Sequence, residues 1–496
     1  MVIDRLRRAG PLVLLALLCS AAVPNANAQT ITNFTQGVKL KEPVANRVYQ
    51  RGRDGRADIP IALDDSVKEG SIVSVSVSGV SGEAHVEEGK ILGIPTGGPY
   101  FINARIKVGN NEQSAVVTNV FVGDLWVLAG QSNMQGVGDL VDVAPPDPMV
   151  MLLGMNGQWS RAEEPLHWLV DSPDSVHSGD PSTREERSIK DHKTRVKGAG
   201  LGLPFASALV QATRVPIGLV ACAHGGTSMA QWDPAKKEEG GKSLYGSMIR
   251  QIGLAGGKVK GILWYQGESD ANPTAAEVYP KKFANFIAAV RDDLKQPDLP
   301  FYFVQIGRVV RAGDPKAWNA VQDAERRLIE RVPNTAVISV IDLELDDGIH
   351  VATQGLKRAG QRLARIAQRE LFGQVGATTP TFDRVNRGAG NTLVVKLQGV
   401  NIAPAASPGE AVVGLKPARH IAGFSLRKDD GTEIPLIFDA AVGNARDTVI
   451  LKLNGAVPEH ANLWYGYGFD TFCNLTDGLD MSVPVFGPIS LDQNDK

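Results

Sequence analysis

The chain has 496 residues, of which 43% are hydrophobic and 21% are charged, and its formal net charge is −2. That length is too great for one ordinary domain, and the composition is that of a globular protein. The near-zero charge gives no indication of a nucleic acid or an anionic membrane as a partner.

The N-terminus has the pattern of a targeting segment. Three arginines within residues 5–8 precede an apolar run at residues 11–19, which is too short to cross a bilayer as a helix. Residues 26–28 read Ala-Asn-Ala, a cleavage pattern of small residues. We therefore predict a signal peptide over residues 1–28, cleaved near Ala28. The mature protein is expected to be secreted or periplasmic and to have no membrane contact after cleavage.

Cysteine usage leaves the disulfide question open. Export would place the mature protein where disulfides can form, but only Cys222 and Cys473 follow the predicted signal peptide. The sequence does not decide whether they pair or remain buried free thiols. No Cys/His cluster has the spacing of a structural zinc site, and we expect neither a metal nor an organic cofactor. The oligomeric state is not defined by the sequence.

Two regions of the chain contain segments that look like β-strands. Residues 71–77 alternate polar and apolar side chains within a glycine- and asparagine-punctuated region that extends over residues 29–119. This region is predicted to be a β-sandwich-like domain. Residues 393–397 and 449–453 also look like strands, so a second β region is expected over residues 376–496.

Between these regions, short apolar runs alternate with longer helical patterns. The runs lie at residues 125–129, 217–223, 262–265, 301–306 and 336–340, and the helical patterns at residues 203–213, 275–294, 318–332 and 354–371. This alternation predicts a parallel sheet covered on both faces. Ligands bind such sheets beyond the carboxyl ends of the strands. The charged segment at residues 155–200 lacks periodicity and is either a flap near the site or a solvated insertion.

The first candidate for chemistry is a serine at a strand end. Residues 130–134 read Gly-Gln-Ser-Asn-Met and follow the apolar run at residues 125–129. Ser132 would face the crevice, and its backbone N–H could face an oxyanion. The pattern favours Ser132 as a nucleophile, and the alternative is a helix N-cap. Gln131 and Asn133 flank it and are expected to contact the substrate.

Two further strings supply candidate oxyanion donors. Gly225 and Gly226 follow a predicted strand, and glycine lets the backbone bring an N–H close to a substrate. Gln266 follows another predicted strand and carries a side-chain amide donor. We expect Gly225, Gly226 and Gln266 to join the Ser132 N–H in the oxyanion site. Trp232 is a candidate sugar-stacking wall, with a core position as the alternative.

An acid and a base complete the set. Residues 347–350 read Asp-Gly-Ile-His, and a tight turn would bring Asp347 beside the imidazole of His350. His350 would then accept the proton of Ser132. Glu268 also follows a strand end and is a rival for the role of the acid. We expect Asp347 to be the principal acid because of its short tether, with Glu268 able to share the task.

With these residues the chain resembles the SGNH hydrolases, in their branch of sialate O-acetylesterase-like and acetylxylan-esterase-like carbohydrate esterases. The strings that carry the resemblance are Gly-Gln-Ser-Asn-Met at 130–134, Gly-Gly-Thr at 225–227 with the following Trp232, Trp-Tyr-Gln-Gly-Glu at 264–268, and Asp-Gly-Ile-His at 347–350. The resemblance implies Ser132 as nucleophile and His350 as base. It also implies an α/β fold: a three-layer αβα SGNH-hydrolase domain with a parallel sheet over residues 120–375, flanked by N- and C-terminal β-sandwich-like regions.

The expected function is therefore that of a secreted serine esterase that removes O-acetyl groups from carbohydrate through an acyl-enzyme. The alternative is a non-catalytic carbohydrate-binding protein on a hydrolase scaffold. The expected partner is an acetylated carbohydrate, and no nucleic acid is expected. Sialic acid, xylan, another plant polysaccharide and a peptidoglycan-derived glycan all remain possible as the sugar.

Overall fold

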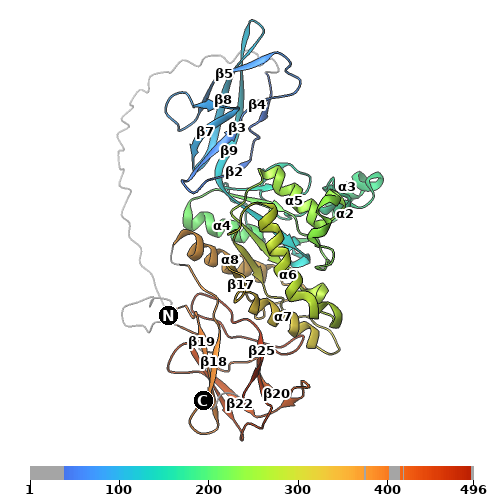
Figure 1. Cartoon of the computed structure of the whole chain (residues 1–496), viewed down its shortest axis with the longest axis vertical. Coiled ribbons are helices and arrows are strands. Elements are labelled where there is room, and N and C mark those ends of the chain that lie inside the picture. Colours follow the sequence, from blue (N-terminus) through green and yellow to red (C-terminus); the bar gives the residue numbers. More distant parts are fainter. Residues whose placement is uncertain (1–37, 374–375, 402–413, 417, 493–496) are drawn as a thin grey trace, which may run out of the picture. The chain divides into compact units, whose positions relative to one another are not determined.

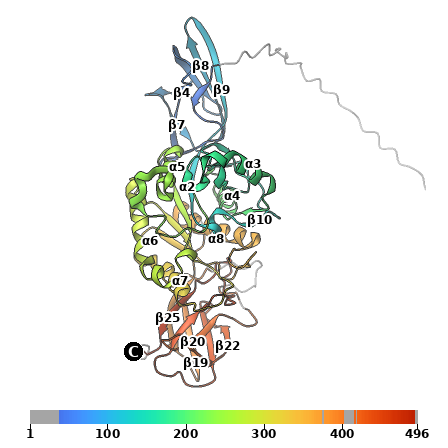
Figure 2. The ribbon, with the colours of Figure 1, turned by 90° about the vertical axis from the view of Figure 1, so that its right-hand side faces the viewer.

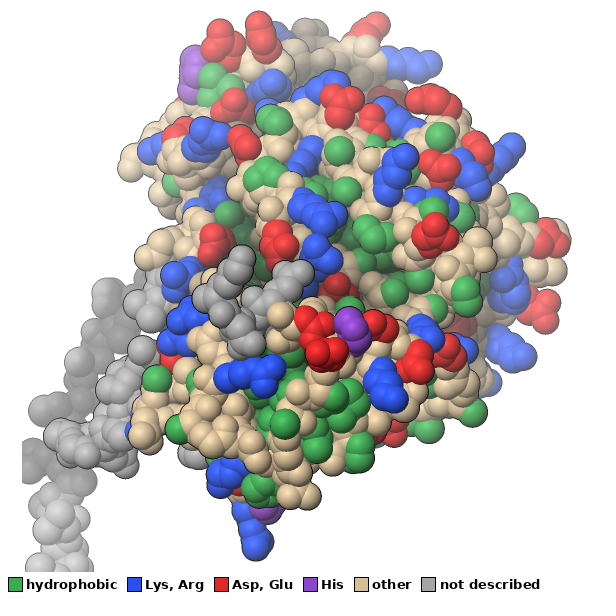
Figure 3. Space-filling model, turned by 60° about the horizontal axis from the view of Figure 1, so that its bottom comes forward, with side chains coloured by type: hydrophobic (Ala, Val, Ile, Leu, Met, Phe, Trp, Pro, Cys, Tyr) green, Lys and Arg blue, Asp and Glu red, His purple; other side chains and the backbone are tan. Residues whose placement is uncertain are grey.

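The computed structural model describes residues 38–373, 376–401, 414–416 and 418–492 (Figure 1). The predicted signal peptide, residues 1–28, lies outside the described residues. Across these described ranges, no helix is both long enough and apolar enough to cross a membrane. On the face drawn in Figure 3, acidic and basic side chains are interspersed, in keeping with a net charge of −2.

The N-terminal strands, coloured blue in Figure 1, form two main antiparallel arrangements around one apolar core. β8 pairs with β5 on one side and β9 on the other, and β7 pairs with β3 and β6. The strands are β1 (Leu40–Glu42), β2 (Val48–Gln50), β3 (Arg56–Pro60), β4 (Ala62–Leu63), β5 (Gly70–Val77), β6 (Val86–Glu87), β7 (Lys90–Pro95), β8 (Gly97–Val108) and β9 (Asn111–Gly130).

Strand β9 belongs to both the N-terminal β region and the central sheet. Its first half pairs antiparallel with β8 and is mostly exposed, whereas every residue from Val120 to Gly130 is buried. That second half is an apolar run because both of its faces are covered, as is typical of a central parallel strand. β9 includes residues 119 and 120, where the sequence predicts a domain boundary, and its pairing with β8 shifts register there, with Asn119 at φ +56°.

The central sheet has the strand order β12-β11-β14-β9-β15-β16-β17, and all neighbouring pairs are parallel except β11 with β12. This confirms the expected mixed α/β fold with a mostly parallel sheet and additional β regions. The remaining strands of this sheet are β11 (Val150–Leu153), β12 (Trp159–Arg161), β14 (Ile217–Ala221), β15 (Gly261–Tyr265), β16 (Phe301–Val304) and β17 (Thr335–Ile338).

Helices flank this sheet, with α4 packed against α8 and α6 against α7 (Figure 2). The helices are α1 (Ser132–Gln135), α2 (Ser175–Ser178), α3 (Arg184–Thr194), α4 (Gly202–Thr213), α5 (Leu244–Ala255), α6 (Pro273–Asp293), α7 (Lys316–Leu328) and α8 (Thr353–Phe372). Short 3-10 turns occur at Leu169–Asp171, Pro181–Thr183, Pro234–Lys242 and Glu268–Asp270, and β10 (Gly138–Asp139) pairs with β13 (Lys197–Ala199).

The C-terminal strands form two four-stranded antiparallel sheets around a core of their own. They are β18 (Thr381–Arg387), β19 (Thr392–Gln398), β20 (Phe424–Arg427), β21 (Glu433–Ile434), β22 (Ile437–Val442), β23 (Thr448–Leu453), β24 (Asn462–Tyr465) and β25 (Phe486–Ser490). The side chain of Gln305 exchanges two buried hydrogen bonds with the backbone of Val485, which joins this region to the end of β16.

Both cysteines expected in the mature chain are buried free thiols. Cys222 follows β14, and Cys473 lies in the C-terminal β region. Burial raises the pKa of each thiol, so neither is an activated thiolate.

Candidate active site

Ser132 stands at the carboxyl end of β9, in the middle of the parallel sheet. Gly130 ends the strand with φ +132°, and a Cβ built there would lie 2.2 Å from the carbonyl oxygen of Tyr265 on β15. Only glycine fits this close approach. The chain can therefore turn sharply after β9 and present Ser132 beyond the sheet edge.

A histidine and an acid stand in line with this serine. His350 Nε2 lies 3.0 Å from Ser132 Oγ, and His350 Nδ1 lies 2.8 Å from Asp347 Oδ2. The other oxygen of Asp347 accepts from the backbone N–H groups of Ile349 and His350, each at 2.9 Å. The three side chains thus have the connectivity of a Ser-His-Asp triad.

Hydrogen bonding keeps Asp347 ionised. Partial desolvation acts to raise its pKa, but the bonds from the His350 ring and the two backbone N–H groups outweigh it and lower the pKa to about 2. The Asp347 side chain is 42% exposed, and that of His350 is 23% exposed. An ionised acid at this position stabilises an imidazolium and fixes which ring nitrogen carries the proton.

The loop that carries Asp347 and His350 is anchored from α8. Arg362 is fully buried and donates to both oxygens of Asp342, each at 2.7 Å, and to the carbonyl of Ser339. A buried ion pair with this geometry fixes the path of the loop after β17. His350 itself is followed directly by the first residues leading into α8.

Glu268, the rival acid, has a different partner. Its Oε1 accepts from Asn133 Nδ2 at 2.8 Å, and the Asn133 oxygen accepts from the N–H of Val351 at 3.0 Å. The residue as a whole is partly exposed, but Oε2 is buried and has no partner in the described part of the chain. Burial raises the pKa of Glu268, although the Asn133 bond and the nearby His350 oppose this. Glu268 therefore supports the site without bonding to the imidazole.

Two backbone N–H groups are available to an oxyanion. The described residues offer no protein acceptor to the N–H of Ser132 or to that of Gly226. Gly226 has φ +70°, and a Cβ built there would meet nothing within 4 Å, so it faces open space. Gly225, in contrast, donates its N–H to Gln135 Oε1 at 2.8 Å. Of the two expected glycines, Gly226 is the one whose N–H has no acceptor in the described ranges.

The expectation that Gln266 donates to the oxyanion needs correction. Gln266 is fully buried, and its amide nitrogen donates to the carbonyl of Thr227 at 3.1 Å and to Asp270 Oδ2 at 2.6 Å. Both N–H bonds are thus used inside the protein. Asp270 Oδ2 also accepts from the N–H of Met229 at 2.8 Å. Gln266 therefore holds the loop that carries Gly226.

We expect Gln266→Ala to destabilise the fold more than it impairs chemistry. The change leaves the Thr227 carbonyl and part of the Asp270 carboxylate without buried donors, which costs about 2–4 kcal/mol of unfolding free energy. Denaturant unfolding together with kcat, measured well below the melting temperature, tests this. A loss of kcat of about a hundredfold with unchanged stability would restore the oxyanion role.

The expected substrate contacts are also revised. Trp232 is fully buried, donates from its indole nitrogen to Thr227 Oγ1 at 2.9 Å, and packs edge-on against Trp264. It is a core residue and not a sugar-stacking wall. Gln131 is 3% exposed, and its Oε1 accepts from the N–H of Ser269 at 3.3 Å. Asn133 is 1% exposed and bonds to Glu268 and Val351, so both side chains join neighbouring loops instead of lining an open surface.

Sequence reasoning missed two neighbours of the oxyanion loop. Gln135 holds Gly225, and the N–H of His224 donates to the carbonyl of Gly130 at 2.9 Å. The ring of His224 also meets His177, which comes from the segment at residues 155–200. The position of His224 directly before two glycines could have indicated that it lies at the oxyanion loop, but nothing in the sequence indicated that its partner is His177.

A serine, a histidine and an acid at the carboxyl edge of a parallel sheet, with free backbone donors beside the serine, define a carboxylic ester hydrolase. The chain belongs to the carbohydrate esterase, sialic acid-specific acetylesterase family, whose model matches residues 122–369, half of the 496 residues.

Two known proteins are similar to this chain, one in sequence and one in fold. The chain is 29% identical over 264 residues to a probable carbohydrate esterase of Arabidopsis thaliana, covering 49% of this chain and 88% of that protein. The crystal structure of a carbohydrate acetylesterase from Xanthomonas citri has the same fold, with a TM-score of 0.62 at 23% identity, covering 89% of this chain and 97% of the other.

Proposed function

We propose that this protein removes O-acetyl groups from carbohydrate through a covalent acetyl-enzyme formed on Ser132. The observation that carries the proposal is a pair of consecutive hydrogen bonds. The first joins Ser132 Oγ and His350 Nε2 at 3.0 Å, and the second joins His350 Nδ1 and Asp347 Oδ2 at 2.8 Å. Membership of a carbohydrate acetylesterase family supports the choice of acetyl and of sugar. A complete Ser-His-Asp triad argues against a purely sugar-binding role.

In the first half of the reaction, Ser132 Oγ attacks the acetyl carbonyl while His350 Nε2 takes its proton. The carbonyl oxygen becomes an oxyanion, which the N–H groups of Ser132 and Gly226 stabilise. His350 is then an imidazolium, stabilised by the ionised Asp347 and by the negative charge of Glu268 close by. His350 gives its proton to the departing sugar oxygen, and the acetyl-enzyme remains.

In the second half, water takes the place of the sugar. His350 accepts a proton from the water as it attacks the acetyl carbon, and the same two N–H groups stabilise the second oxyanion. Collapse of this intermediate releases acetate and returns the proton to Ser132. Apart from the substrate and water, the cycle uses only groups that the chain itself supplies.

The direct test of the proposed function is acetate release from a panel of acetylated sugars. The panel contains monoacetylated methyl xylosides, an O-acetylated sialoside, acetylated xylan and an O-acetylated peptidoglycan fragment. We expect acetate from at least one member at a rate that saturates with substrate. Hydrolysis of aryl acetate alone, with no release from any sugar, would reject the carbohydrate assignment.

The acetyl-enzyme should be trapped on Ser132. Because deacylation needs a general base, acid quenching during turnover should preserve the ester, and digestion should give a peptide containing Ser132 that is heavier by one acetyl group. Mass spectrometry of the quenched digest measures this. The same peptide from a Ser132→Ala protein serves as the control. An acetyl group on any other residue, or none under saturating substrate, would argue for direct attack by water.

Three further features are proposed with the function. Residues 1–28 act as a signal peptide, which makes the mature protein secreted or periplasmic. The domains extend over residues 29–119, 120–375 and 376–496. Separate apolar cores in the N- and C-terminal β regions support three domains, and β9 continues across the first boundary, with Val120 and Val122 packed in the N-terminal core. The hydrolase domain is a three-layer αβα SGNH fold, which the helix pairs α4–α8 and α6–α7 beside the sheet support.

A further inference from the structure

A chain of polar side chains ends at the oxyanion loop, and its three inner members, Asp174, Ser247 and His177, are buried. Arg250 donates to Asp174 Oδ2 at 3.0 Å from Nε and 2.7 Å from Nη2. Ser247 Oγ donates to the same oxygen at 2.5 Å. His177 Nε2 lies 3.1 Å from Ser247 Oγ, and His177 Nδ1 lies 3.0 Å from Nδ1 of His224. None of these five side chains takes part in the triad.

The direction of each hydrogen bond follows from the charges in this chain. Asp174 is ion-paired with Arg250, and a carboxylate can only accept, so Ser247 directs its single hydroxyl proton to Asp174. Ser247 Oγ must then accept from His177, whose ring proton is on Nε2. Burial lowers the pKa of His177 to about 3, so the ring is neutral and Nδ1 carries a lone pair. His224 must therefore donate from its Nδ1.

His224 is thereby left with an acceptor on its other ring nitrogen. A neutral histidine that is protonated on Nδ1 has a lone pair on Nε2. Burial lowers the pKa of His224 as well, which favours this neutral form. No hydrogen bond to Nε2 occurs within the described residues, and His224 is one of the residues that line a cavity of about 360 Å³. Its lining also includes Gly225, Gly226, Gln231, Lys236 and Glu239.

This cavity adjoins the nucleophile through the two glycines that line it. A Cβ built on Gly225 would lie 3.4 Å from Ser132 Cβ, and Gly226 carries the free N–H of the oxyanion site. A group held in the cavity therefore lies beside the oxyanion loop, close to the ester under attack. Lysine, glutamate and glutamine side chains among its lining residues suit a polyhydroxylated ring better than an apolar chain.

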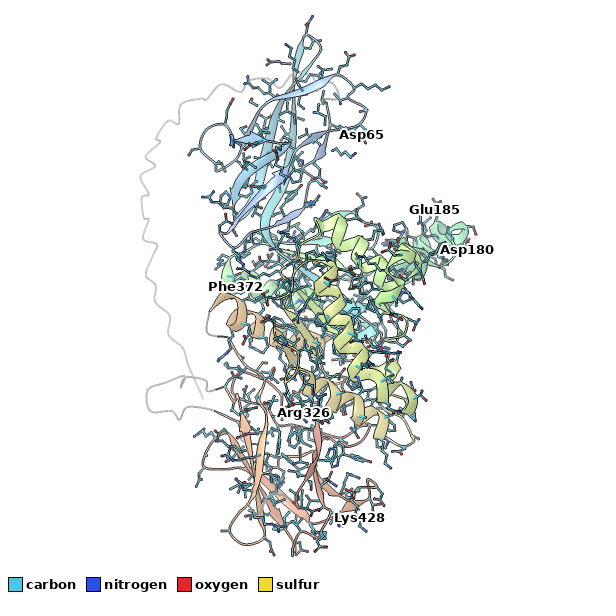
Figure 4. The ribbon with its side chains drawn as sticks, in the orientation of Figure 1. Asp65, Asp180, Glu185, Arg326, Phe372 and Lys428 are labelled. Carbon is cyan, nitrogen blue, oxygen red and sulfur yellow. The ribbon has the colours of Figure 1, made fainter. Side chains whose placement is uncertain are left out.

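The segment at residues 155–200 gains a role from this arrangement. Asp174 and His177 come from it, while Ser247 and Arg250 lie on α5. Asp180 and Glu185, labelled in Figure 4, mark the part of the segment that follows His177. The segment therefore supplies two of the five polar side chains, on either side of Ser247, and is not a solvated insertion alone.

We propose that His224 is a specificity-determining residue, which accepts at Nε2 a hydrogen bond from a hydroxyl group of the sugar that carries the acetyl ester. His177, Ser247 and Asp174 are positioning residues that fix the His224 tautomer. The proposal rests on the proposed sugar esterase function but is separable from it, because an esterase can hydrolyse acetylated sugars without contacting a hydroxyl through His224.

The test pairs a change in the enzyme with a change in the substrate. The first substrate is the best-hydrolysed monoacetylated sugar of the panel, and the second is its deoxy analogue without the hydroxyl groups next to the ester. In the wild type, loss of the hydroxyls should lower kcat/KM about tenfold. In His224→Phe, which keeps a ring but has no acceptor, the two substrates should be hydrolysed with the same kcat/KM.

Further variants separate positioning from folding. His224→Gln retains an acceptor oxygen and should recover part of the tenfold discrimination. Ser247→Ala removes the hydrogen bond that fixes which nitrogen of His177 carries the proton, so it should reduce the discrimination between the two substrates. A variant that only lost folded protein would lower the rates on both substrates equally and would leave the discrimination unchanged. His192→Ala is the matched control, because this histidine lies on α3 of the same segment and pairs with Asp171 outside the polar chain. It should keep the full discrimination.

The outcomes distinguish the two proposals. If the wild type releases acetate from sugars but does not discriminate against the deoxy analogue, or if His224→Phe still discriminates, the role of His224 is overturned and the esterase function stands. If the wild type releases acetate from no sugar, both proposals are wrong.

Discussion

Replacing Ser132 with alanine should lower kcat on any acetate ester by about 10⁴-fold or more, because the acyl-enzyme pathway then has no nucleophile. The protein should remain folded. Among the described residues, the Ser132 side chain makes one hydrogen bond, with His350, and alanine keeps the Cβ that packs near Gly225. The loss of unfolding free energy should therefore be about 1 kcal/mol or less.

The measurement is kcat on an aryl acetate and on an acetylated sugar, with denaturant unfolding of the same preparation. Ser71→Ala is the control, because Ser71 is an exposed serine on β5 in the N-terminal β region. It should have the kcat of the wild type. A folded Ser132→Ala protein that retains near wild-type kcat would show that another group performs the attack.

The central strands could be predicted because burial on both faces imposes continuous apolar runs. All five runs that the sequence predicts as strands coincide with β9, β14, β15, β16 or β17, and the four helical patterns coincide with α4, α6, α7 and α8. The sequence motifs of the candidate site follow the carboxyl ends of these strands. The structure accordingly brings Ser132, Asp347 and His350 within hydrogen-bonding distance.

Elements without such a pattern could not be predicted. Helix α3 (Arg184–Thr194) has no buried residue, so it has no apolar stripe to give a helical period. Helix α5 (Leu244–Ala255) contains Gly246 and Gly253, which weaken the helical pattern. Strand β11 (Val150–Leu153) has only four residues, and a run so short is ambiguous.

Side-chain direction is the other property that a one-dimensional pattern does not contain. The sequence placed Gln266 and Trp232 near the site but could not show that both point to Thr227 and are buried there. Hydrogen-bond partners decide whether an amide or an indole is free for a substrate. The same limit explains why the contact between His224 and His177 was not predicted, since 46 residues separate them along the chain.

Asp347→Asn should lower kcat by about 10³–10⁴-fold, far more than the matched change at the rival acid. One oxygen of Asp347 accepts two backbone N–H groups, and the other accepts from His350 Nδ1. The single oxygen of an asparagine would stay on the two backbone donors, so its NH₂ group would face Nδ1. The His350 proton would then move to Nε2, which could no longer accept from Ser132.

Glu268→Gln should be milder, with a fall in kcat of about tenfold, or ~1.4 kcal/mol of transition-state stabilisation. The glutamine oxygen can still accept from Asn133 Nδ2, so the geometry is kept, and only the negative charge near His350 is lost. Asp346→Asn is the control for charge alone, because this acid sits in the same turn and bonds to the N–H of Asp139 instead of the imidazole. It should cost much less than Asp347→Asn.

The double variant Asp347→Asn/Glu268→Gln distinguishes one principal acid from a shared role. If Asp347 alone fixes the tautomer, the double variant should lose little more than Asp347→Asn. If the two acids share the task, each single change should be mild and the double change severe, because groups that act as a unit are not additive. A loss in Glu268→Gln as deep as in Ser132→Ala, with Asp347→Asn nearly active, would instead make Glu268 the principal acid and require His350 to turn toward it during catalysis.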